Sequence, residues 1–168
     1  MLTQPAKVHV LQGTPRARIT GFPGGVYVLD ARVLDMAQSA EALAGALLLA
    51  ETRLRMTDPV RPVLAHIGTV KTLELLTTGD VPGAALAGYA AAHSRAPAPA
   101  PDPTTVLARF EALNLSTRPF ADNPDPLDPD ADALLPALRT GDPLAGQLSE
   151  RALLSDGQWV SLQNICAF

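Results

Sequence analysis

Cysteine is almost absent from this sequence, since Cys166 is the only one among 168 residues. A single cysteine excludes a disulfide within the chain, which is typical of proteins in a reducing compartment. No basic region followed by an apolar run opens the sequence, so we predict no signal peptide and expect a cytoplasmic protein. Cys166 has no histidine near it in the sequence and stands on an apolar helical face. We therefore expect a buried structural thiol rather than a nucleophile.

Aromatic residues make up only 4% of the chain, and the net charge is −4 with an isoelectric point near 5.2. Basic residues are scattered, and no cluster exceeds the pair Arg53 and Arg55, so no surface that follows nucleic-acid phosphates is predicted. The longest apolar run, Ala42 to Ala50, is too short to cross a bilayer. We therefore expect a soluble protein that binds neither nucleic acid nor a membrane.

Several catalytic motifs are also missing. Gly24 and Gly25 lack the Gly-x-Gly spacing and the following Lys-Ser/Thr of a phosphate-binding loop. No Gly-x-Ser-x-Gly nucleophile motif occurs. The histidines His9, His66 and His93 form no His-x-x-x-His pair, and none lies at ligand spacing from the cysteine. The sequence therefore predicts no metal site and no cofactor.

The stretch between Pro119 and Asp132 is rich in aspartate, a residue type that binds calcium in proteins. An EF-hand loop needs a glycine at its sixth position and a glutamate at its twelfth, and neither is present. The prolines of this stretch would also break the ligand spacing. We therefore expect a solvated loop, whose acidic residues are Asp122, Asp125, Asp128, Asp130 and Asp132.

Alanine and leucine are abundant, and both favour packed helices over sheets. Short strands are predicted at Lys7 to Leu11, at Arg16 to Thr20 and at Val26 to Leu29, with a glycine turn at Phe22 to Gly25 before the last of them. Ser39 is placed to cap a long helix, and Gly79 to end the next one. The predicted helices are Asp30 to Met36, Ala40 to Met56, Pro62 to Leu76, Pro82 to His93, Thr104 to Leu113, Ala133 to Leu138, Pro143 to Leu154, and a docked tail at Asp156 to Cys166.

These elements predict an α+β fold that is mainly helical, with a small N-terminal antiparallel sheet or hairpin packed on a helical bundle. We expect a single domain, 1–168. Within it, 1–95 forms the α+β core and 104–168 a helical C-terminal subregion. Residues 96–103 alternate Ala and Pro, which favours extended polyproline-like chain that acts as a stiff spacer.

One stretch, from Phe22 to Arg55, resembles a known family. The sequence FPGGVYV, then VLDMA, then EALAGAL, looks like the core of the HtpX/BepA-like zinc metallopeptidases, the HExxH family that includes bacterial periplasmic proteases. Gly24 and Gly25 match the turn of that family, Tyr27 and Val28 the strand, and Leu43-Ala44 the approach to the zinc helix. The resemblance implies the family's α+β core for 1–95.

In this register the residues that carry the family's chemistry are replaced. The two histidine positions fall on Leu49 and Arg53, and the general-base glutamate falls on Ala50. Glu51 is one position away, which rotates it about 100° around the helix. Catalytic zinc needs about three protein ligands, and leucine offers none while arginine repels a cation. The resemblance thus implies a vestigial site at Leu49, Ala50, Glu51 and Arg53.

We therefore expect a non-catalytic pseudo-peptidase that acts as a binding or regulatory module. Because the family lays an extended peptide along a sheet edge, we expect a groove for a peptide or protein beside the strand, at Gly24, Gly25, Val26, Tyr27 and Val28. One alternative is an enzyme with a rebuilt site on the same fold, for which His66 and Glu74 are the candidates. Another is a structural protein whose Ala-rich helices pack on a second copy as a homo-oligomer.

Overall fold

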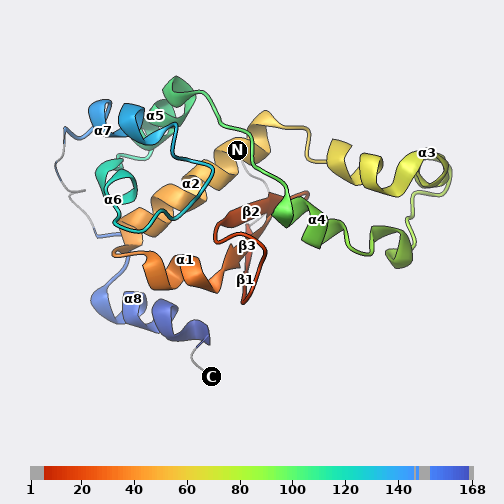
Figure 1. Cartoon of the computed structure of the whole chain (residues 1–168), viewed down its shortest axis with the longest axis horizontal. Coiled ribbons are helices and arrows are strands. Elements are labelled where there is room, and N and C mark those ends of the chain that lie inside the picture. The colour runs from red at the N-terminus through yellow and green to blue at the C-terminus, as the bar shows by residue number, and fades with distance from the viewer. Residues whose placement is uncertain (1–5, 146, 148–151, 167–168) are drawn as a thin grey trace.

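A computed structural model describes residues 6–145, 147 and 152–166 of the chain. It is mainly helical with a small N-terminal sheet (Figure 1), which confirms the expected α+β class. The strands are β1 (Lys7–Leu11), β2 (Ile19–Phe22) and β3 (Val26–Asp30). The helices are α1 (Ala31–Met36), α2 (Ala40–Met56), α3 (Arg61–Thr78), η1 (Gly83–Leu86), α4 (Tyr89–Arg95), α5 (Pro103–Ala112), α6 (Arg118–Ala121), α7 (Leu135–Thr140), α8 (Asp156–Gln163) and η2 (Asn164–Cys166).

The sheet is mixed rather than antiparallel. Strands β2 and β3 form the expected antiparallel hairpin, and the turn between them places Gly24 and Gly25 at φ values of 80° and 72°. Such left-handed values favour glycine. Strand β1 pairs with the other edge of β3 and runs parallel to it, since two chain reversals bring β3 back to the direction of β1. The strand order is therefore β1-β3-β2, with β3 in the centre.

Helix α2 lies at the centre of the molecule, between the sheet and the helices α5 and α6. Its start is fixed as the sequence predicts, because the Ser39 hydroxyl accepts a hydrogen bond of 3.1 Å from the Ala42 amide. Gly45 stands where α2 meets α6, and a Cβ at this position would lie only 2.5 Å from Cβ of Phe120. The close approach of these two helices therefore requires a residue without a side chain.

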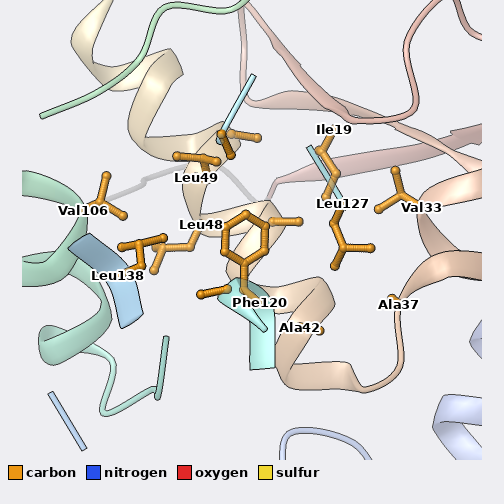
Figure 2. Packing of buried hydrophobic residues seen from close by; sticks show 14 of the residues in the cluster. Ile19, Val33, Ala37, Ala42, Leu48, Leu49, Val106, Phe120, Leu127 and Leu138 are labelled. Carbon is orange, nitrogen blue, oxygen red and sulfur yellow. The ribbon is translucent and has the colours of Figure 1, made fainter. Parts of the chain in front are cut away.

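The hydrophobic core forms around α2 (Figure 2). Leu48 and Leu49 of this helix pack among Val106 of α5, Phe120 of α6 and Leu138 of α7. Residues of the sheet and of α1 join the same cluster. Helices on both sides of the Ala/Pro stretch therefore bury their apolar residues together. The tail also docks as expected, because Trp159 and Leu162 of α8 pack against this cluster.

Helix α3 is present where the sequence predicts it, but it is not packed. It projects from the body together with η1 (Figure 1), and none of its residues is buried, whereas α4 packs against β2 through contacts of Tyr89 and His93 with Phe22. Gly68 breaks the helix in the middle at φ 77° and ψ 173°, a conformation open almost only to glycine. Gly79 ends it in the left-handed conformation, as expected of its cap. The single helix predicted at Pro82 to His93 is instead divided into η1 and α4 at Gly88.

None of the described helices combines the length and the apolar character needed to span a bilayer. Part of the helix predicted at Pro143 to Leu154 concerns residues 146 and 148–151, which lie outside the described residues. The prediction of a buried thiol at Cys166 likewise concerns a side chain outside the described part.

Candidate functional site

Two hollows lie along α2 on different sides. The first, which we call the arginine cleft, has a volume of about 100 Å³ and lies between β2, α2 and the Ala/Pro stretch. Arg18, Ala50, Arg53, His93 and residues 96–99 are among its lining residues. The second, which we call the apolar groove, has a volume of about 230 Å³. It is lined by Ala6, Val8, Tyr27, Ala44, Leu47, Leu48, Glu51, Leu113 and Leu115.

Arg53 is the centre of the arginine cleft and is only 6% exposed. Its guanidinium forms an ion pair with Asp128, which is 3% exposed. The same guanidinium donates hydrogen bonds to the carbonyl oxygens of Pro99, at 3.0 Å, and Asp130, at 3.2 Å. Arg53 thus ties α2 to the Ala/Pro stretch and to the acidic loop at once.

A second ion pair lies beside the first. Arg18, which is 4% exposed, pairs with Asp130 and donates a hydrogen bond of 2.7 Å to the Ala96 carbonyl. Asp130 also accepts from Arg16, at 2.7 Å, and from the Ala98 amide, at 3.1 Å. Burial alone would raise the pKa of Asp130, but the Ala98 amide and the charges of Arg18 and Arg16 hold it below the ordinary value.

These contacts correct two expectations from the sequence. The acidic loop is not simply solvated, because the carboxylates of Asp128 and Asp130 are ion-paired inside the fold. Residues 96–102 form neither helix nor strand, and Pro103 already begins α5, but the stretch is not a free spacer, since arginine side chains hold Ala96 and Pro99 against the cleft. Both features follow from residues far apart in the sequence, and the local composition of each segment gave no sign of them.

The four vestigial positions point to different parts of the molecule. Ala50 and Arg53 line the arginine cleft, while Leu49 is fully buried in the core. Glu51 faces the apolar groove, where its carboxylate pairs with Arg55, at 2.7 Å, and with Arg109. Zinc does not fit this arrangement, because the polar group that faces the cleft is a cation already paired with a carboxylate. No group of three His, Cys, Asp or Glu side chains in the described ranges could hold a metal ion.

The alternative pair, His66 and Glu74, is not brought together as a site. The two residues lie on either side of the break at Gly68, and each has its own partner. His66 donates from Nε2 to the Ala87 carbonyl at 3.1 Å, while Glu74 pairs with Lys71 at 2.6 Å. His66 also packs edge-on against the ring of Tyr89, which joins α4 to α3. These contacts hold the projecting arm together.

The expected peptide groove beside β3 is misplaced, because β3 pairs with a strand on each side and has no free edge. Of the residues expected to line it, Tyr27 does line the apolar groove, whereas Gly24 and Gly25 form the hairpin turn and Val26 and Val28 are not among its lining residues. Burial, and then the nearby Glu51 carboxylate, raise the pKa of Tyr27.

The free edge of the sheet next to the groove belongs to β1. In the described part of the chain, β1 pairs only with β3. The Lys7 amide donates to the Gly25 carbonyl at 3.0 Å, so Lys7 turns its backbone groups toward β3. Backbone groups alternate in direction along a strand, and those of Val8 therefore point to the open side. Val8 itself lines the groove and is 49% exposed.

Comparisons with family models, with curated proteins and with solved structures found no significant match to this chain. The candidate site is therefore defined by its own geometry. The sequence pattern did not single out Arg18, Asp128 or Asp130, nor the contribution of Leu113 to the groove. The alternation of apolar residues in β1 was the one local signal that pointed toward the groove.

Proposed function

We propose that this chain is a non-catalytic protein of zinc metallopeptidase ancestry that binds an extended peptide segment of another protein. The observation that carries this proposal is the open edge of β1 directly beside the apolar groove. Exposed strand edges offer unpaired backbone groups that can pair with an added strand, and a neighbouring pocket then selects alternate side chains. With its single cysteine, the protein suits a reducing compartment such as the cytoplasm.

The surroundings of β1 define the chemistry of the peptide. Side chains of the added strand that point to the same face as Val8 would enter a groove lined by Leu47 and Leu113, and they should be apolar. On the opposite face they would stand beside Lys7, which is exposed. An acidic residue at that position would complement its charge. We therefore propose a ligand with alternating apolar and acidic residues in extended conformation.

The arginine cleft supports a non-catalytic role. Arg53 and Arg18 are buried and already satisfied by Asp128, Asp130 and carbonyl oxygens of the Ala/Pro stretch. Groups engaged in this way stabilise the fold, and they are not available to activate a water molecule or a substrate. An enzyme with a rebuilt site is the less favoured alternative, because its candidates His66 and Glu74 are engaged elsewhere.

The test is a binding titration with a fluorescein-labelled peptide of alternating Val and Glu, followed by fluorescence polarisation. Val8→Pro removes the outward backbone N–H but leaves the hydrogen bonds between β1 and β3. We expect it to weaken binding about fivefold relative to Val8→Ala, since a hydrogen bond contributes on the order of 1 kcal/mol. Both variants remove the valine methyl groups, and proline in addition removes the outward N–H, so the comparison reports mainly on the backbone contact.

Two further variants separate the groove from the rest of the strand. Leu47→Glu places a charge in the groove and is expected to abolish binding, whereas Leu11→Gln, an uncharged change at an exposed position of β1 that does not line the groove, should bind like the wild type. Equal binding by Val8→Pro and Val8→Ala would contradict strand addition. No binding of the peptide by the wild-type protein would contradict the proposal as a whole.

A further inference from the structure

The second half of α3, residues 69–78, exposes an apolar stripe to water. Val70 is 78% exposed, Leu73 is 64% exposed and Leu76 is 77% exposed. A spacing of three residues places these side chains along one side of the helix. No residue of α3 is buried, and its main contacts are with η1 and α4. Contiguous exposed apolar surface of this kind marks an interaction site.

The charges beside the stripe indicate what covers it. Residues 69–78 contain one cation, Lys71, and one anion, Glu74, which pair with each other at 2.6 Å within the chain and keep further donors and acceptors for a second copy. Relative to Val70, Glu74 is rotated about 40° and Lys71 about 100° around the helix, both away from Leu73 and Leu76. The two charged residues therefore flank the stripe on the same side. When the helix of a second copy runs in the opposite direction, the apolar stripes of the two copies face each other and the cation of each copy lies near the anion of the other.

We propose that the stripe is the contact surface of a homodimer, in which residues 69–78 of two copies pack antiparallel and cross at Leu73. Val70 of each copy then lies against Leu76 of the second copy. In antiparallel helix pairs the same flank of each helix meets across the contact, so Lys71 faces Glu74 of the second copy. If the two helices ran parallel, Lys71 of one copy would instead lie at the same height along the helix axis as Lys71 of the second copy, and Glu74 at the same height as Glu74.

The position of α3 allows this contact. The helix projects from the body (Figure 1), so a second copy can approach it without meeting α2 or the sheet. Ten helical residues extend about 15 Å, and two such segments bury less than the roughly 800 Å² per partner of a typical stable complex. We therefore infer a weak dimer that forms in the micromolar range or above. The dimer is independent of peptide binding, because β1 and the apolar groove lie on the body.

The test is sedimentation equilibrium of the whole chain over a range of micromolar concentrations. The mass of the wild-type protein should rise from monomer toward dimer. Leu73→Glu should remain monomeric, and Lys71→Glu should weaken the dimer about tenfold by setting like charges across the contact. Combining Lys71→Glu with Glu74→Lys restores opposite charges and should restore the dimer. Val160→Glu, at an exposed position of α8, is the control and should dimerise like the wild type.

All these positions are exposed, so circular dichroism should show an unchanged fold. A wild-type protein that stays monomeric throughout the range overturns the proposal. A Leu73→Glu variant that still dimerises also overturns the proposal, because the contact surface of the dimer then lies elsewhere. If Lys71→Glu weakens the dimer and the double variant does not recover it, the antiparallel arrangement is wrong.

Discussion

Arg53→Met is expected to lower the free energy of unfolding by about 3–5 kcal/mol, which is a large part of the stability of a single domain. The reason is that Asp128 remains buried, at 3% exposed, after its cation is removed. The Ala/Pro stretch also loses the hydrogen bond that Arg53 donates to Pro99. Urea unfolding at neutral pH, followed by circular dichroism, measures the change.

Two control variants make this test specific. Adding Asp128→Leu to Arg53→Met removes the orphaned carboxylate, and the double variant should be more stable than the single one. Arg55→Met breaks an exposed ion pair with Glu51 and should cost at most about 1 kcal/mol. If Arg53→Met were no more destabilising than Arg55→Met, the arginine cleft would not be a structural centre of the fold.

Acid is expected to unfold the protein steeply, because two carboxylates, the buried Asp30 and the half-buried Asp130, bind protons less readily in the folded than in the unfolded chain. Burial opposes charge on Asp30, but hydrogen bonds from Arg32 and Thr14 prevail and hold its pKa below the ordinary value. The pKa of Asp130 is also lowered, as described above. Since the unfolded chain binds more protons, the free energy of unfolding decreases as the pH falls below about 4 and through each lowered pKa.

A series of urea titrations from neutral pH to strong acid measures this dependence. Asp130→Asn should be less stable at neutral pH and should show a shallower loss of stability in acid, because one proton-linked group is removed. Asp125→Asn, at an exposed position of the same loop, is the matched control. A stability that does not change between neutral pH and strong acid would contradict the buried ion pairs.

Local patterns predicted much of the secondary structure. The Ser39 cap and the Ala/Leu periodicity placed α2 within the residues that the structure assigns to it, and the Gly24-Gly25 turn marked the hairpin. Such features depend on neighbouring residues, and the sequence displays them directly. The α+β class followed from the same patterns.

Local sequence patterns could not predict contacts between residues that are far apart in the chain. Arg53 and Asp128 are 75 residues apart, and nothing around either residue indicates the other. The strand β1 was predicted, but the same sequence separation concealed its parallel pairing with β3, which makes β3 the central strand and places the open edge on β1. Periodicity also identified the apolar side of α3 but gave no information on what covers it, and in the single chain nothing buries that side.

Taken together, the contacts show that the positions matched to a zinc site by the sequence resemblance are part of the packing of this chain. Ala50 and Arg53 border a cleft closed by the Ala/Pro stretch, while Glu51 turns to the groove on the other side of α2. We propose that binding has moved accordingly to the open edge of β1. Under this proposal the protein binds a peptide segment but does not cleave it.

Metal content tests the non-catalytic account most directly. The protein is purified without chelator and without a histidine tag, dialysed, and measured by elemental mass spectrometry. The account predicts zinc well below one atom per chain, because Leu49 and Arg53 offer no ligand and Arg53 is paired with Asp128. Zinc near one atom per chain that survives dialysis would contradict it, since other residues would then have rebuilt a metal site.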